Sequence, residues 1–144
     1  MTHVDSALQI LRDLGLPRAQ LNDRSALTLL ALLDLKSDQW WKTATAPLMG
    51  ITPVMDWIRT HYGRNYAPNT RETFRRQTMH QFVAAGLVAY NPDKPDRPVN
   101  SPAAVYQLGE PALKLLRIYG SHGWARALAT FRSQAGSLAE TYAR

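Results

Sequence analysis

The alternation of apolar and polar positions along the chain predicts a mostly helical protein. In six stretches apolar residues recur every three or four positions, the spacing that gives a helix one buried face. The stretch after Asn22 is rich in leucine and alanine on most sides, so we expect it to be the central helix of the core. The expected helices span residues 6–14, 23–34, 52–62, 69–85, 110–119 and 124–142.

Residues typical of helix ends support these boundaries. Thr52 is expected to cap a helix through its hydroxyl, and it is followed by Pro53, which is favoured at the first position of a helix. Asn69 is expected to cap the helix that follows it, and Glu72 stands at the spacing of a capping box. The other expected caps and ends are Asp5 or Ser6, Asn22, Gly15, Gly63 and Gly86.

Two short apolar runs, residues 87–90 and 104–108, predict strands. The segment between them, NPDKPDRPVNSP, is too rich in proline to form a helix and is a poor strand. A hairpin with a long loop is the simplest arrangement. Residues 43–50 are expected to form another loop.

This order of elements indicates a mainly α fold with a small β-hairpin: a winged helix-turn-helix with additional N- and C-terminal helices. We expect a single domain over residues 1–144, which is long enough to bury one hydrophobic core. The expected parts are a helix-turn-helix at about 52–85, a wing at about 86–108 and C-terminal helices at about 110–142. The connection from Gly63 to Asn69 is longer than the tight turn of the simplest helix-turn-helix.

The charge balance points to an anionic partner. The formal net charge is +6 and the isoelectric point is near 10.0, which favours nucleic acid first and a membrane surface second. The sequence has no cysteine, which excludes disulfides, cysteine-ligated zinc and thiol catalysis. Its longest apolar run, residues 26–33, is far shorter than the roughly 20 residues that span a bilayer. With no signal peptide evident, we expect a soluble, cytoplasmic protein.

The expected helix at 69–85 has two faces of different chemistry. Phe74 and Phe82 mark a face that can pack on the core, together with Thr78, Gln81 and Ala85. The opposite face carries Asn69, Glu72, Thr73, Arg76 and His80, and its donors and acceptors are of the kind that read base edges in a DNA major groove. The ordinary alternative is a solvated face on which Glu72 and Arg76 form a weak ion pair.

These features predict a set of DNA-contacting residues. Arg76 is expected to contact guanine O6 and N7, and His80 a base or a phosphate. Long arginine stems at the border of the buried face are expected to reach phosphates. The predicted residues of the helix are Asn69, Thr70, Arg71, Thr73, Arg75, Arg76, Gln77 and His80, and those near the turn and on the wing are Arg59, Arg64, Lys94, Arg97, Asn100 and Ser101.

The sequence offers no catalytic or metal-binding pattern. The four histidines lack metal-ligand spacing, and no glycine-rich phosphate loop is present. The triplet Asp34-Leu35-Lys36 matches half of a metal-dependent nuclease motif, but it lies at the end of a leucine-rich helix without a preceding acid. We therefore expect this chain to catalyse nothing alone and to hold no cofactor.

Four longer segments together resemble the amino-terminal region of the BsuBI/PstI family of type II restriction endonucleases. They are LGLPRAQLNDRSALTLLALLDLK (14–36), PLMGITPVMDWI (47–58), HYGRNYAPNTRETFRRQTMHQFVAAGLV (61–88) and NSPAAVYQL (100–108), and the match covers most of residues 8–119. The resemblance implies a winged-helix DNA-recognition domain in which 69–80 is the DNA-binding helix and 100–108 is part of the wing.

The same resemblance implies the rest of the enzyme. Family members normally join this domain to a downstream Mg²⁺-dependent nuclease domain of the PD-(D/E)xK type, which is absent from this sequence, so no catalytic residue carries over. The implied partner is double-stranded DNA with a short palindromic target, cut by a homodimeric enzyme in the prokaryotic cytoplasm. The alternatives are a stand-alone winged-helix transcription regulator and a basic winged helix that binds protein.

Overall fold

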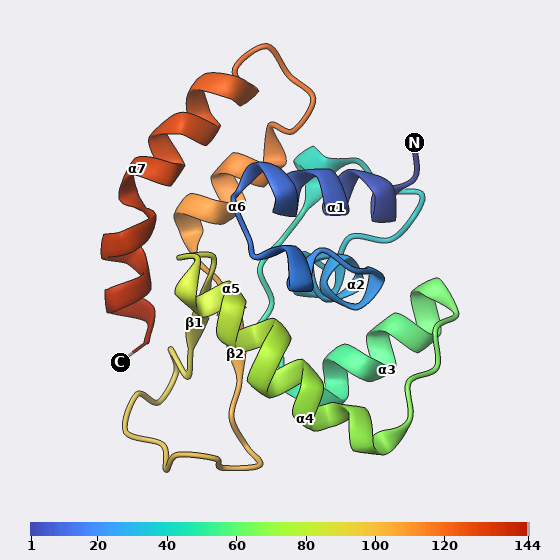
Figure 1. Cartoon of the computed structure of the whole chain (residues 1–144). Coiled ribbons are helices and arrows are strands. Elements are labelled where there is room, and N and C mark those ends of the chain that lie inside the picture. The colour runs from blue at the N-terminus through green and yellow to red at the C-terminus, as the bar shows by residue number, and fades with distance from the viewer. Residues whose placement is uncertain (144) are drawn as a thin grey trace.

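The computed structural model describes residues 1–143 and confirms the mainly helical fold with a two-stranded hairpin (Figure 1). The α-helices are α1 (His3–Asp13), α2 (Asp23–Leu32), α3 (Ile51–Tyr62), α4 (Arg71–Thr73), α5 (His80–Ala84), α6 (Glu110–Arg117) and α7 (Trp124–Tyr142). The strands are β1 (Val88–Tyr90) and β2 (Tyr106–Leu108). Short 3₁₀ turns lie at Arg18–Gln20, Trp41–Thr43 and Pro68–Thr70, and a π-helical segment spans Phe74–Met79.

Helix α2 lies at the centre of the core, as its leucine-rich sequence predicts. All eight residues from Ser25 to Leu32 are buried. Asn22 caps the helix as expected, because its side chain accepts a hydrogen bond of 2.9 Å from the backbone N–H of Ser25. Helix α1 packs along one side of α2, and α3 lies on another side (Figure 1).

Two expected helix starts were wrong. Helix α1 begins at His3, because Thr2 is the cap and Asp5 is its capping-box partner at the third helical position. Helix α3 begins at Ile51, one residue before the expected cap Thr52, and no side chain caps it. Its end is as predicted: Gly63 follows the last turn with φ +69°, a left-handed conformation that favours glycine.

The segments from Pro68 to Ala84 follow one another as a continuous helical run, here named the 68–84 helix (Figure 1). Asn69 lies inside its first 3₁₀ turn and makes no capping bond, so the expected cap and capping box at this end were wrong. The π-helical segment takes up about one extra residue per turn, since its hydrogen bonds join residues five apart. This wider winding turns Met79 into the core beside Thr78, which a regular helical period does not predict.

The hairpin follows the 68–84 helix and is closed by antiparallel pairing of Val88 with Leu108 and of Tyr90 with Tyr106. Met49 adds a short bridge on the other side of β2, where its N–H and C=O bond to Tyr106 at 2.9 and 2.8 Å. The expected loop at 43–50 therefore includes one residue, Met49, that is bridged to β2. Together, α2, Met49, α3, the 68–84 helix and the hairpin follow the order of a winged helix.

Helices α6 and α7 complete the fold, with α7 lying against α6 and β1 and reaching the side of the hairpin (Figure 1). Gly86, which has φ +75°, ends α5 where α7 passes close by. A Cβ atom at Gly86 would stand 2.6 Å from the carbonyl oxygen of Ala135, so both the backbone conformation and the packing of α7 require glycine here. No helix among residues 1–143 is long and apolar enough to cross a membrane.

Candidate nucleic-acid interface

The outer face of the 68–84 helix is strongly polar. Arg76 is the most prominent member, with 73% of its side chain exposed, and Glu72, Gln77 and His80 are exposed beside it. The opposite face is fixed to the core by fully buried side chains, which are Phe74, Thr78, Met79 and Phe82. The predicted division of the helix into a packed face and a solvent-facing polar face is thus present.

Glu72 forms hydrogen bonds with two arginines on this outer face. Its carboxylate accepts hydrogen bonds of 2.8 and 3.1 Å from Nη2 of Arg75 and one of 2.8 Å from Nε of Arg76. The bonds from Arg75 are the main cause that holds the pKa of Glu72 below its ordinary value, and Arg76 adds to the effect. Glu72 is therefore ionised at neutral pH and partly neutralises the two cations.

Arg75 also connects the helix to the loop between β1 and β2, here named the wing loop (residues 91–105). Its Nη1 donates a hydrogen bond of 2.6 Å to Oδ1 of Asn100, and only 23% of its side chain is exposed. Asn100 has φ +63°, a left-handed conformation in which asparagine is favoured over most residues. Arg75, predicted to extend to a phosphate, instead lies in a contact between two parts of the protein.

The base of the wing loop is organised by Asn91 and Arg97. Asn91 is 1% exposed, and its Oδ1 accepts hydrogen bonds from Nη1 of Arg97 at 2.8 Å and from the N–H of Val105 at 2.9 Å. Arg97 also forms a bidentate pair with Asp93 at 3.0 and 3.1 Å, which lowers the pKa of Asp93. With only 13% of its side chain exposed, Arg97 holds the loop rather than extending to solvent as expected. Lys94 remains exposed on the same loop.

The other predicted residues lie outside the contacts of Glu72, Arg75 and Asn100. Arg59 pairs with Asp56 at 3.0 Å, and Arg64 pairs with Asp23 at 2.8 Å, each about half exposed. Arg71 and Ser101 both line a small hollow of about 180 Å³ between the helix and the wing loop. Asn69 is exposed at the start of the helix, while Thr70 and Thr73 are half-buried.

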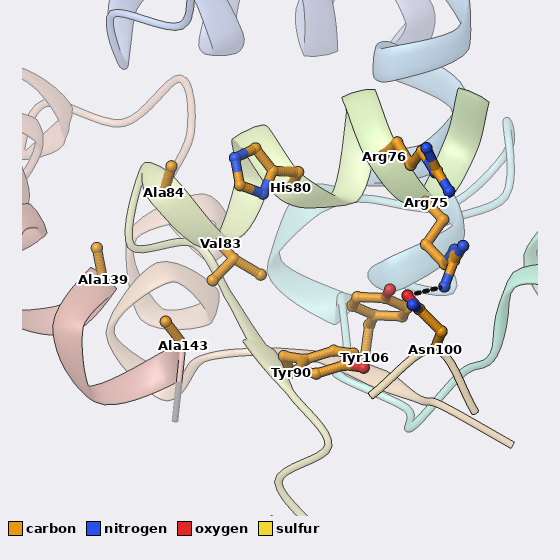
Figure 2. Close-up of a pocket in the computed structure, with 10 residues that line it drawn as sticks. All are labelled: Arg75, Arg76, His80, Val83, Ala84, Tyr90, Asn100, Tyr106, Ala139 and Ala143. Carbon is orange, nitrogen blue, oxygen red and sulfur yellow. Dashed lines mark hydrogen bonds between the residues drawn. The ribbon is translucent and has the colours of Figure 1, made fainter. Parts of the chain in front are cut away.

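A larger cleft of about 530 Å³ lies between the 68–84 helix, the hairpin and the end of α7 (Figure 2). Two tyrosines from facing strand positions, Tyr90 and Tyr106, lie with ring centres 5.4 Å apart on its wall. Burial raises the pKa of Tyr106 to about 12, so its hydroxyl is neutral at physiological pH. The remaining lining residues are Arg75, Arg76, His80, Val83, Ala84, Asn100, Ala139 and Ala143.

Sequence reasoning missed the two tyrosines and the role of Glu72 as a shared acceptor. The tyrosines were detectable in principle, because Tyr90 ends the first predicted strand and Tyr106 lies within the second, and the two strands pair in a hairpin. Within the described residues, 1–143, no three His, Asp or Glu side chains gather into a group that could hold a metal ion.

Comparison with known proteins gives consistent matches. A family model described as the BsuBI/PstI restriction endonuclease HTH domain matches residues 1–140. The type II restriction enzyme BsuBI of Bacillus subtilis is 52% identical over 143 residues, 99% of this chain and 45% of that protein. The type II restriction enzyme AplI of Arthrospira platensis is 40% identical over 136 residues, 94% of this chain and 42% of that protein.

A solved structure shares the fold. The structure of the SdaI restriction endonuclease superposes with a TM-score of 0.89 at 35% sequence identity, over 97% of this chain and 44% of that one. In each of these comparisons the chain spans less than half the length of its relative.

Proposed function

The chain belongs to the BsuBI/PstI family of type II restriction endonucleases, and on that basis we propose that it recognises a specific sequence in double-stranded DNA. In this role the 68–84 helix enters the major groove and the wing loop contacts the neighbouring backbone or minor groove. The domain would direct a restriction nuclease to its target.

The observation that carries this proposal is the geometry of Arg76. It projects from the outer face of the helix with 73% of its side chain exposed, and Glu72 holds its Nε. Its two terminal nitrogens, Nη1 and Nη2, have no hydrogen-bond partner within residues 1–143. Two parallel donors match the O6 and N7 acceptors of guanine in the major groove, which is the commonest specific contact in protein–DNA complexes.

The remaining roles follow from position and existing partners. Gln77 and His80 are exposed on the same face as Arg76 and are proposed to contact bases or the adjacent phosphates. Backbone contacts are proposed for residues at the edges of this face, which are Arg59, Arg64, Asn69, Thr70, Arg71, Thr73, Lys94 and Ser101. Arg75, Arg97 and Asn100 are proposed to hold the wing loop in place rather than to bind DNA directly.

The activity of the whole enzyme is part of the same proposal. A nuclease domain outside this chain would use Mg²⁺ to cut a short palindrome, and pairing of two copies would place one domain on each half-site. None of this chain's residues is assigned to the cleavage step.

Selection of bound fragments from a random duplex pool tests the proposal. We expect the 144-residue chain to enrich one short sequence, and its affinity for that duplex to fall steeply between about 50 and 200 mM salt, because phosphate contacts release counterions. Absence of duplex binding, or binding with no enriched sequence, would contradict sequence recognition by this chain. Genome context offers a second check, since a neighbouring DNA methyltransferase gene is expected beside a restriction enzyme.

A further inference from the structure

Glu72 is an unusual residue at the centre of a surface proposed to bind DNA, because a carboxylate repels phosphates. Its side chain is more than half exposed on the outer face of the 68–84 helix. It nevertheless accepts hydrogen bonds from two arginines, Arg75 and Arg76. Since Glu72 reduces the positive charge of this surface, these hydrogen bonds are the place to look for its function.

We infer that Glu72 is a positioning residue that gives this surface its sequence preference by orienting Arg76. This inference rests on the proposed function. The carboxylate accepts a hydrogen bond of 2.8 Å from Nε of Arg76, which leaves the terminal pair, Nη1 and Nη2, without a partner among residues 1–143 on a side chain that is 73% exposed. A guanidinium held in this way presents its end to guanine without the loss of side-chain freedom that an unrestrained arginine undergoes on binding.

The same carboxylate connects Arg76 to the wing loop. Glu72 holds Nη2 of Arg75, and Nη1 of Arg75 holds Asn100. The four side chains therefore form one hydrogen-bonded chain, which joins the donor proposed to read the base to the loop proposed to approach the backbone. The position of the wing loop and the orientation of Arg76 therefore both depend on Glu72.

Glu72 also disfavours contacts that carry no sequence information. Paired with Glu72, Arg76 is a weaker partner for a phosphate than a free arginine, because the neighbouring negative charge opposes a second one. Without the carboxylate, Arg76 is free to bend toward the backbone of any duplex. Loss of Glu72 is thus expected to strengthen binding to unrelated DNA and to weaken discrimination.

The test compares Glu72→Ala, Glu72→Gln and the wild-type chain on two duplexes, the sequence enriched from the random pool and a scrambled duplex of the same composition. For Glu72→Ala we expect the ratio of the two affinities to fall about tenfold, the discrimination supplied by a good bidentate contact. The affinity for the scrambled duplex rises, and its salt dependence steepens by about one phosphate contact as Arg76 is released.

Glu110→Ala is the matched control. Glu110 is also an exposed glutamate paired with a basic residue one helical turn away, Lys114 at 3.5 Å, but it lies on α6, outside the proposed interface. Its removal changes the net charge by the same amount, so it measures the general effect of charge. We expect it to leave the affinity ratio and the salt dependence unchanged.

Glu72→Gln separates orientation from charge, because its amide oxygen still accepts a hydrogen bond. We expect it to retain more of the preference than Glu72→Ala while binding the scrambled duplex more tightly than the wild type. Equal loss of preference in both variants, or weaker binding to the enriched duplex with no gain on the scrambled one, would overturn the positioning role. If the wild-type chain binds no duplex, the proposed function fails first; if it binds selectively and Glu72→Ala behaves like Glu110→Ala, only this inference fails.

Discussion

Two helices of this protein, α2 and the 68–84 helix, are in contact and make opposite use of their side chains. In α2 every residue from Ser25 to Leu32 is buried, so the helix contributes to stability on all sides. The 68–84 helix buries only four side chains fully and exposes a polar face. The two meet where Nε of Arg24 donates a hydrogen bond of 3.0 Å to Oγ1 of Thr78.

The difference shows that the surface that stabilises the fold is separate from the surface for which DNA recognition is proposed. The core on which the 68–84 helix rests is built by α2 and its neighbours, so the outer face is free to carry charges that contribute little to folding. Exposed ion pairs such as Glu72–Arg76 typically contribute less than about 1 kcal/mol to stability. Substitutions in the two regions should therefore have separable effects.

The largest effect is expected in α2. Leu29 is fully buried, and Leu29→Ala should lower the free energy of unfolding by about 2–5 kcal/mol, because the lost side chain leaves a cavity. Urea denaturation measures the loss, and Leu48→Ala, at a partly exposed leucine, is the control. A loss below about 1 kcal/mol would contradict the central place of α2 in the core. Under conditions where the variant is folded, its DNA preference should be that of the wild type.

An intermediate effect, on binding alone, is expected at Arg76. Arg76→Ala should weaken binding to the enriched duplex by about 1–3 kcal/mol and flatten the preference over a scrambled duplex. The free energy of unfolding should change by less than about 0.5 kcal/mol, because the side chain is exposed. Arg126→Ala, which removes an exposed arginine from α7, controls for charge. Equal losses on both duplexes would show that Arg76 contacts backbone rather than bases.

The smallest effect is expected where the two helices meet. Thr78→Val keeps the buried volume but removes the acceptor of the bond from Arg24, and should cost about 0.5–1.5 kcal/mol of stability. A double-mutant cycle with Arg24→Ala measures the coupling between the two side chains. Strict additivity of the two substitutions would mean that the bond contributes nothing to holding the helices together.

Local signals in the sequence predicted much of this fold. Asn22 caps α2, and Gly63 and Gly86 end helices, because each position has a requirement that few residue types satisfy. The packed face of the 68–84 helix followed from the spacing of Phe74 and Phe82. These features depend on residues close together in the chain, which is why the pattern alone was sufficient.

The errors arose where the structure depends on distant partners. Met49 is bridged to Tyr106, which lies 57 residues later in the chain, and the residues around Met49 do not have the pattern of a strand. The sequence also did not show that loop geometry gives Arg75 and Arg97 partners inside the protein, namely Asn100, Asp93 and Asn91; DNA contact by these two arginines stays a prediction. The choice among several possible partners for one arginine is not encoded in its immediate neighbours.

The π-helical segment at Phe74–Met79 has a consequence for how this protein family can change over time. Such a segment holds a residue that an α-helix joining the same two ends would not need. Loss of one residue there would convert the segment to a regular α-helix, while the residues before and after it keep their packing against the core. The same event would rotate the outward side chains of the segment, including Arg76, relative to the rest of the protein. If the outer face reads DNA as proposed, a one-residue deletion in this segment is thus a route by which a lineage could acquire a new target sequence while keeping its core.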